Sequence, residues 1–225
     1  DSSSVNLDLT SGVIKIFSNQ DAFAALKDDG SVVTWGTSNY GGDSSSVSSS
    51  LSSGVIEIYS TNFAFAALKS DGSVVTWGSG YWGGDSSSVA TELGTGVVEI
   101  FSAMNAFAAL KSDGSVVTWG DVYFGGDSSP VSSSISSGVV EIFSTQKAFA
   151  ALKSDGSVVT WGENTWGGDS SSVSYSINSG IVNIFSSAAV FVALDSDGAN
   201  PPADGTACDD GDPSTTGDVY VNGVC

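Results

Sequence analysis

Carboxylates are the only abundant titratable side chains in this sequence of 225 residues. It contains 25 Asp and Glu against 6 basic residues, all of them Lys, and it has no His. Without His, neither a Ser/His/Asp nor a Cys/His catalytic arrangement can be assembled. Paired carboxylates can hydrolyse glycosides, but the aspartates recur at equivalent positions. Asp71 and Asp113 each precede a glycine, where aspartate is an ordinary turn residue. The residue types therefore predict a protein that is not an enzyme.

A second group of carboxylates, Asp209, Asp210 and Asp212, lies near the C-terminus. Their oxygens are the ligands that calcium prefers, although the alternating ligand positions and the late glutamate of an EF-hand loop are absent. Two interpretations stay open. One is a weak calcium site, with calcium as the single candidate cofactor, and the other is a turn with solvated aspartates.

The two cysteines, Cys208 and Cys225, bracket this acidic segment. Such a pair around a short polar loop predicts one disulfide, and with it an oxidising setting outside the cell or at its surface. No stretch of the sequence reaches the apolar length of a membrane span. We therefore expect an extracellular protein with no membrane insertion.

The formal net charge of −19 limits the partners. Nucleic acids and anionic membrane surfaces are bound through clustered cations, so neither is expected here. Cationic proteins, divalent metals and neutral glycans remain open. High negative charge also keeps a protein soluble, which is the simplest explanation for it.

An internal repeat of 42 residues organises the chain. Trp35, Trp77, Trp119 and Trp161 recur at this interval without a single insertion or deletion. The predicted units are residues 1–42, 43–84, 85–126, 127–168 and a shortened 169–198. Residues 199–225 form a separate acidic tail.

The second unit contains three strand-like runs and no segment of helical length. These are Val55 to Tyr59, Ala64 to Leu68 and Ser73 to Trp77, and Lys69-Ser70-Asp71-Gly72 reads as the hairpin turn between the last two. Three or four short strands per unit are typical of a propeller blade. We expect an all-β fold, a β-propeller of five blades. A parallel β-solenoid is less favoured, because its coils are usually shorter and lack hairpin turns.

The run A-L-K-S-D-G-S-V-V-T-W-G at residues 67–78, with Val55-Ile56-Glu57-Ile58-Tyr59 before it, resembles the repeat of the regulator-of-chromosome-condensation propellers. The resemblance covers residues 1–198 and implies the blade fold. The same run of residues is also similar to the repeat of a secreted bacterial β-lactamase-inhibitor propeller. The family commonly has seven blades and often a histidine where this chain has Phe65 and its equivalents. Residues that act on a small GTPase have no counterpart, so the resemblance implies no functional residue.

The shortened fifth unit suggests how the ring closes. Residues 217–223, G-D-V-Y-V-N-G, have the length and alternation of the strand that this unit lacks. We expect the fifth blade to combine residues 181–185, 190–194, about 218–222 and the first few residues of the chain. A ring closed by strands from both ends leaves no free sheet edge.

The connections after the first and third strands vary between units, whereas the hairpin after the second strand is nearly constant. In an up-and-down blade the two variable connections emerge on one face, so this pattern predicts a binding face. Drift in unconstrained loops, and aromatic side chains that serve only as wedges between blades, would give the same pattern. The candidate binding residues are Phe63, Tyr81, Trp82, Met104, Asn105, Tyr123, Phe124, Lys147 and Trp166.

The sequence thus predicts a non-catalytic extracellular interaction module that binds a protein or a glycan through variable loops on one face of a propeller. Two alternatives remain. One is a structural subunit of an extracellular filament, coat or appendage, in which the chain would self-assemble. The other is an inhibitor of a secreted enzyme, which is implied by the family resemblance alone.

Overall fold

The protein is an all-β molecule made of five antiparallel sheets, seen in a computed structural model that describes residues 2–196. Four sheets have three strands in the order of the chain, and the fifth has two. The described residues contain no α-helix, only short 3-10 helices between strands, and none of these helices is long and apolar enough to cross a membrane. The sheets resemble propeller blades, in agreement with the sequence.

The strands are β1 Val13–Ser18, β2 Ala22–Lys27, β3 Val32–Gly36, β4 Val55–Ser60, β5 Ala64–Lys69, β6 Val74–Gly78, β7 Val97–Ser102, β8 Ala106–Lys111, β9 Val116–Gly120, β10 Val139–Ser144, β11 Ala148–Lys153, β12 Val158–Gly162, β13 Ile181–Ser186 and β14 Phe191–Asp195. The 3-10 helices are η1 Ser3–Val5, η2 Ser38–Tyr40, η3 Ser45–Val47, η4 Gly80–Trp82, η5 Ser87–Val89, η6 Glu92–Gly94, η7 Val122–Phe124, η8 Ser129–Val131, η9 Asn164–Trp166 and η10 Ser171–Val173.

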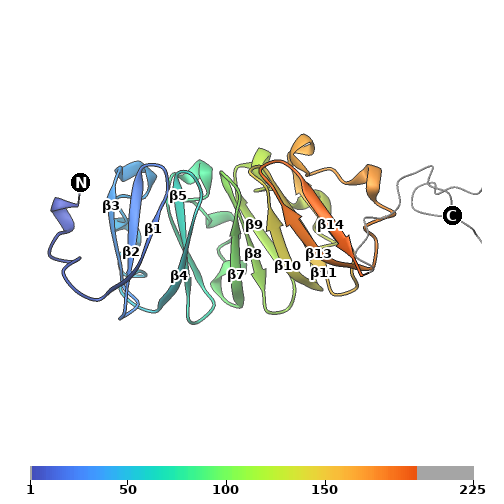
Figure 1. The fold of residues 1–225 in the computed structure, drawn as a ribbon. Coiled ribbons are helices and arrows are strands. Elements are labelled where there is room, and N and C mark those ends of the chain that lie inside the picture. Colours follow the sequence, from blue (N-terminus) through green and yellow to red (C-terminus); the bar gives the residue numbers. More distant parts are fainter. Residues whose placement is uncertain (1, 197–225) are drawn as a thin grey trace, which may run out of the picture.

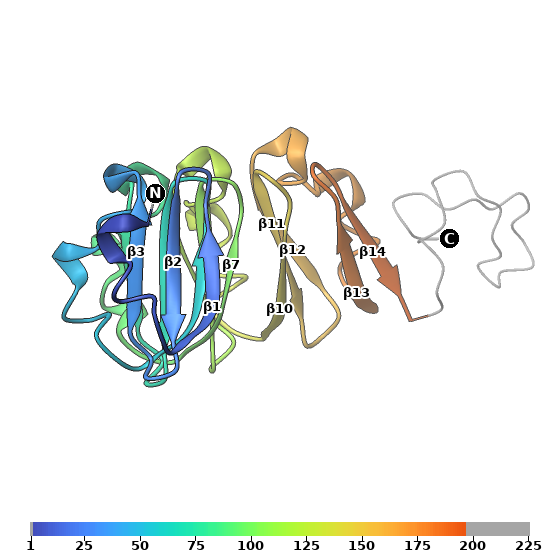
Figure 2. The same ribbon diagram turned by 60° about the vertical axis from the view of Figure 1, so that its left-hand side comes forward.

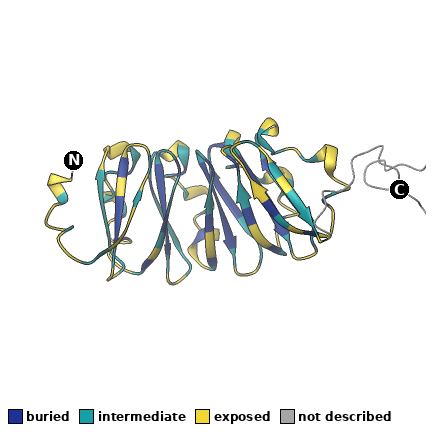
Figure 3. Ribbon diagram, in the orientation of Figure 1, coloured by how far each residue is buried: buried dark blue, intermediate teal, exposed yellow. Residues whose placement is uncertain are grey.

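The sheets follow one another side by side in chain order, with β1–β3 at one end of the row and β13–β14 at the other (Figures 1 and 2). Buried residues concentrate in the strands, and exposed residues gather in the connections at either end of the sheets (Figure 3). No strand pairing joins the first sheet to the fifth within residues 2–196. The segment 218–222, which would complete the fifth blade, lies outside the described residues.

The first residues of the chain differ from the expectation that they contribute a strand to the fifth blade. Ser3–Val5 form the 3-10 helix η1, which packs against β3 of the first sheet. The same D-S-S-S-V sequence in the second unit also forms a 3-10 helix, η3. There the Asp43 carboxylate accepts a hydrogen bond from the Ser45 amide at 2.9 Å, and this turn competes with an extended strand.

In the first four units, the hairpin turn between the second and third strands contacts the next unit. Gly72 has a φ of +77°, and a Cβ on it would lie 2.8 Å from the Gly96 nitrogen of the following unit. The Gly72 carbonyl also accepts a hydrogen bond from the Val97 amide at 3.0 Å. Glycine is therefore needed here both for the left-handed backbone and for the close approach of two chains.

The second strand of each interior sheet, β5, β8 or β11, packs on both of its faces. Along β5, Ala64, Ala66 and Leu68 contact the third unit, while Phe65 and Ala67 contact the first. All four of the residues from Ala64 to Ala67 are 0% exposed. Successive residues of a strand point to opposite faces, so a run that is apolar throughout is what a strand between two neighbouring sheets requires.

In the second, third and fourth sheets, a tryptophan forms a hydrogen bond to a glycine turn of the sheet before it. The Trp77 indole Nε1 donates a hydrogen bond to the Gly41 carbonyl at 3.1 Å, and a Cβ on Gly41 would lie 2.6 Å from the Phe65 ring. The same indole bond recurs from Trp119 and Trp161 to the glycine turns of the units before them, at 3.1 Å each. These tryptophans are therefore packing residues between blades.

Trp77→Phe removes the bond between units and leaves the buried Gly41 carbonyl without its partner. We expect a loss of about 1–3 kcal/mol in the free energy of unfolding, measured by urea denaturation. Trp35→Phe is the matched control, because no unit described in the structure precedes Trp35, and it should cost below about 1 kcal/mol. Equal losses for the two variants would contradict the role assigned to this bond.

The aspartates of the hairpin turns make the stability of the folded protein depend on pH in the acidic range. Hydrogen bonds from the hydroxyl and the amide of Ser73 lower the pKa of the Asp71 carboxyl, and Asp29, Asp113 and Asp155 have lowered pKa values for the same reason. A carboxyl whose pKa is lower in the folded state adds stability above its unfolded pKa. That stability is lost as the pH falls through the folded pKa.

Replacing all four of these aspartates by asparagine should therefore flatten the fall in stability below about pH 4. The measurement is the urea midpoint as a function of pH for both proteins. If the urea midpoint of the fourfold variant falls with decreasing pH as steeply as that of the unchanged protein, other groups cause the loss of stability in acid.

Candidate binding surface

The two variable connections of each unit meet at the same edge of the sheets. The Thr61 hydroxyl, after β4, donates a hydrogen bond to the Trp82 carbonyl, after β6, at 2.9 Å. Thr145 and Trp166 repeat this contact at 2.9 Å in the fourth unit. We call this edge the rim. It consists of residues 19–21 and 37–41, 61–63 and 79–83, 103–105 and 121–125, and 145–147 and 163–167.

Backbone hydrogen bonds join the rim loops of the first four units to one another and to the equivalent loop of the fifth unit, residues 187–189. The Asn62 amide donates to the Met104 carbonyl at 2.7 Å, and the Met104 amide donates to the Gln146 carbonyl at 2.9 Å. Gln20 to Asn62 and Gln146 to Ala188 extend the line at 3.1 and 2.9 Å. Loops that are held in this way keep their side chains in fixed relative positions.

Aromatic rings from neighbouring units interleave along this line. Phe63 lies between Tyr40 of the unit before it and Trp82 of its own unit, with ring centroids 4.7 and 4.4 Å away. All three rings are half-buried. Offset and tilted contacts at this separation are favourable, because the edge of one ring faces the electron-rich face of another.

Lys147 occupies the position equivalent to Phe63 in the fourth unit. Its Nζ lies 5.2 Å from the centre of the Phe124 ring of the unit before and 4.7 Å from that of Trp166 in its own unit. A cation between two rings continues the row by cation–π attraction. In the third unit this position is Asn105, whose buried Oδ1 has no hydrogen-bond partner among the described residues.

Two tyrosines project from the rim. Tyr81 is 63% exposed and Tyr123 is 70% exposed, and both stand at the centre of their 3-10 helices, η4 and η7. Asp121 fixes the second of these helices, because its carboxylate accepts a hydrogen bond from the Tyr123 amide at 3.0 Å. The exposed tyrosines thus stand on a supported backbone.

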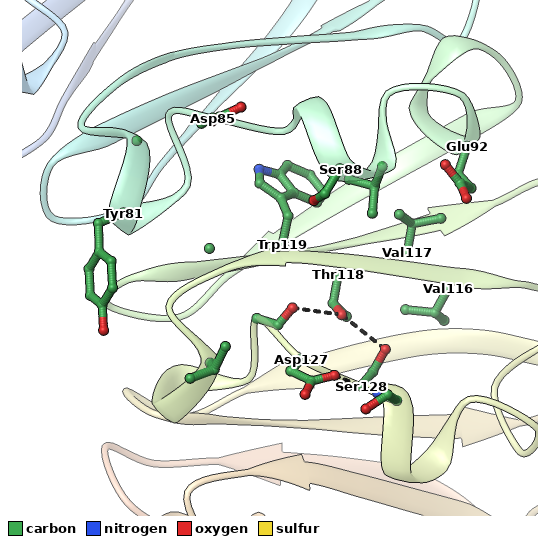
Figure 4. Close-up of a pocket in the computed structure, with 16 residues that line it drawn as sticks. Tyr81, Asp85, Ser88, Glu92, Val116, Val117, Thr118, Trp119, Asp127 and Ser128 are labelled. Atoms are coloured by element: carbon green, nitrogen blue, oxygen red, sulfur yellow. Dashed lines mark hydrogen bonds between the residues drawn. The ribbon is translucent and has the colours of Figure 1, made fainter.

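A pocket of about 550 Å³ opens beside Tyr81 and is lined by residues of the second, third and fourth units. Figure 4 shows Tyr81 on one side of it and Glu92 on the other, with Trp119 and Thr118 of β9 between them. Asp85, Glu92 and Asp127 are among the residues that line it, and no lysine is. Such a lining suits neutral or cationic groups.

Two of the three pocket carboxylates, those of Asp85 and Asp127, accept hydrogen bonds within their own turns. The Ser87 amide hydrogen-bonds to Asp85 and lowers its pKa, and the Ser129 amide does the same for Asp127. Both carboxyls therefore stay ionised at neutral pH, which is not the behaviour of a general acid.

No group of three or more His, Cys, Asp or Glu side chains within residues 2–196 is placed to hold a metal ion. The calcium candidates Asp209, Asp210 and Asp212 lie outside the described residues, as do Cys208 and Cys225. Both the calcium site and the disulfide stay predictions.

The nine candidate residues from the sequence all lie on the rim. The structure brings Phe63 to Trp82 and Lys147 to Phe124 and Trp166, and it leaves Tyr81 and Tyr123 exposed. Val122, which is 55% exposed beside Tyr123, and the pocket carboxylates Glu92 and Asp127 were not among the candidates. The pocket is lined by residues of three units, so no single unit carries a sequence signal for it.

No protein-family model matches the chain, and no curated protein sequence matches it. Among solved structures, human WBSCR16 is similar at 20% identity and a TM-score of 0.42, over 70% of this chain and 49% of that one. Prp20p from Saccharomyces cerevisiae is similar at 16% identity and a TM-score of 0.48, over 81% of this chain and 50% of that one. The CRINKLY WD40 ectodomain of the Arabidopsis thaliana receptor kinase ACR4 is similar at 12% identity and a TM-score of 0.46, over 81% of this chain and 60% of that one.

The chain spans about half the length of the first two of these proteins. Structures of RCC1 (Prp20) are thus among those similar to this chain, in line with the resemblance of the repeat. At these identities and TM-scores the likenesses carry nothing about function. The blade-like architecture rests on the five sheets themselves.

The contact of Phe63 with Trp82 should couple their energies. In a double-mutant cycle of Phe63→Ala and Trp82→Ala, followed by urea unfolding, we expect a coupling of about 0.5–1.5 kcal/mol. Phe63→Ala with Trp166→Ala is the control, because these side chains lie two units apart and should be additive. Zero coupling in the first pair would mean that the rim rings do not support one another.

Proposed function

We propose that this protein is a non-catalytic interaction module that binds a protein or a glycan through the rim. The observation that carries the proposal is two groups of packed rim side chains, one of Tyr40, Phe63 and Trp82 and one of Phe124, Lys147 and Trp166. Tyr81 and Tyr123 project into solvent beside them. Tyrosine offers a large contact area, a hydroxyl for hydrogen bonding and few rotatable bonds, so it is enriched in binding surfaces.

The frame beneath these side chains supports binding as well. Hydrogen bonds between Asn62, Met104 and Gln146 hold the rim loops before any partner arrives. A surface that is already ordered loses less conformational entropy when it binds, which leaves more of the contact energy for affinity.

Charge favours a neutral or cationic partner. The chain carries −19 overall, and the rim lysine, Lys147, already contacts two rings. Tyr81 stands beside a pocket lined by three carboxylates. A basic protein segment or a hydroxyl-rich sugar therefore fits this surface better than a phosphate or a nucleic acid does.

Prp20p, one of the similar structures, has binding properties toward Gsp1p and histones, and yeast RCC1 (Prp20) forms a complex with Kap60. Those are properties of that protein. For the present chain, a protein partner remains part of our proposal and is supported by the rim.

An extracellular setting, a disulfide between Cys208 and Cys225, weak calcium binding by the tail and a ring of five blades closed by residues 218–222 belong to the same proposal. A structural subunit of an extracellular coat or filament is the second candidate. It is favoured by exposed apolar side chains at both ends of the row, among them Ile16 and Phe185, and it requires the chain to self-associate. Inhibition of a secreted enzyme has no support beyond the family resemblance.

The rim can be tested with the full chain and a photo-crosslinking residue placed at Tyr81 or Tyr123. The probes are a glycan array and the proteins of the native medium. We expect adducts or bound spots at both positions, and a loss of binding of about tenfold or more in the double variant Tyr81→Ala, Tyr123→Ala. Ser70 and Ser112, in hairpins at the opposite edge of the sheets, are the control positions. Adducts that form equally well from the control positions, or binding that survives the double variant, would refute the proposal.

A further inference from the structure

The first unit carries a docking face on its outer side. We call it the first-unit face, and it consists of Leu9, Val13, Ile16, Phe23 and Trp35. Ile16 is 57% exposed and Phe23 is 42% exposed, and the other three are half-buried. A run of large apolar side chains on one side of a sheet is unusual unless something covers it.

The same five positions are buried in the second, third and fourth units, each of which has a neighbour before it. Ile58, Ile100 and Ile142 are each 2% exposed, and Phe65, Phe107 and Phe149 are 0% exposed. Trp77, Trp119 and Trp161 are at most 3% exposed. The residue types at these positions in the first unit are those of the interior units. Within residues 2–196, only the lack of a preceding unit distinguishes this face.

The interior units identify what covers such a face. In the second unit it is covered by Ala22, Ala24 and Leu26 of the unit before, and these side chains form one cluster with Ile58 and Phe65. The glycine turn at Gly41 lies on the Phe65 ring, and its carbonyl accepts the Trp77 indole bond. A covering blade therefore needs two alanines in its second strand and a glycine turn after its third.

The fifth unit departs from this pattern in its second strand. Val190 and Val192 stand where the other four units have alanines, and they are 54% and 48% exposed. Added methyl groups at a close-packed contact force side chains or backbone apart, at a cost of about 1–3 kcal/mol. The two ends of the row therefore differ. The first unit keeps the side chains that interior units pack against the blade before them, whereas the fifth unit lacks the alanines that interior units pack against the blade after them.

Terminal units of a repeat array need an outer face that tolerates water, and such units usually replace interface residues by polar ones. The first unit makes no such replacement at any of the five positions. We propose that the first-unit face is a docking surface for a further blade of this same repeat, one with the Ala-x-Ala-x-Leu strand and the Gly-Gly turn. The face is independent of the rim, so this proposal is separate from binding through the rim. It is the alternative to a five-blade ring closed by residues 218–222, because such a ring would cover the same face.

The test extends the full chain by one blade, a copy of residues 43–84 placed directly before Asp1, which preserves the 42-residue register. The readout is solvent exchange of the Trp35 indole N–H, followed by NMR and assigned with Trp35→Phe. In the chain without the extension we expect this N–H to exchange at least about ten times faster than that of Trp77, which is bonded to Gly41. In the extended chain the Trp35 indole should become as slow as the Trp77 indole.

A matched control carries Ala64→Val and Ala66→Val in the copied blade alone, which gives it the valines of the fifth unit. It should leave the Trp35 indole fast. The proposal is overturned if the appended blade folds, as judged by protection of its own strands, and Trp35 still exchanges as in the chain without the extension.

It is equally overturned if the Trp35 indole is already slow in the chain without the extension. Removal of residues 197–225 would then identify the tail as the occupant if it restores fast exchange. Sedimentation at micromolar concentration would identify a second copy if Phe23→Asp or Val190→Asp abolishes a dimer.

Discussion

The close approach of neighbouring sheets is the constraint on which the rest of this structure depends. It is made possible by alanines at two positions of the second strand in each of the first four sheets, such as Ala64 and Ala66, which leave room for the Ile and Phe side chains of the next sheet. Protein interiors are packed as densely as organic crystals, so each contact of this kind fixes both the spacing and the register of two sheets. Four such contacts, one between each pair of neighbouring units, hold the described residues together.

The rim inherits its order from these contacts. Because the sheets repeat at a constant spacing, the loop after each first strand meets the aromatic residue that follows the third strand of the unit before, as Phe63 meets Tyr40. The position of a rim side chain is thus set by the frame, while its type is free to change. Phe63, Asn105 and Lys147 occupy one position in three units. This separation of position from chemistry is what allows a repeated scaffold to present a surface that differs from place to place.

The sequence predicts the strands well, because their signals are local. The runs Val55 to Tyr59, Ala64 to Leu68 and Ser73 to Trp77 correspond to β4, β5 and β6 within one residue at each end. The outer segments were less predictable. Asp43-Ser44-Ser45 reads equally as a strand or a loop, and a local hydrogen bond from the Ser45 amide to the Asp43 carboxylate decides for a 3-10 turn. The contacts of Lys147 with Phe124 and Trp166 join residues from two units, so they follow from the spacing of the sheets and not from any one segment.

Native-state hydrogen exchange of the backbone amides in the second strands tests the stacking of sheets most directly. The account predicts the strongest protection in β5, β8 and β11, which have a sheet on either side, and weaker protection in β2 and β14 at the ends of the row. Uniform protection across all five second strands, or the strongest protection in β2, would contradict the idea that contacts between neighbouring sheets hold this protein together.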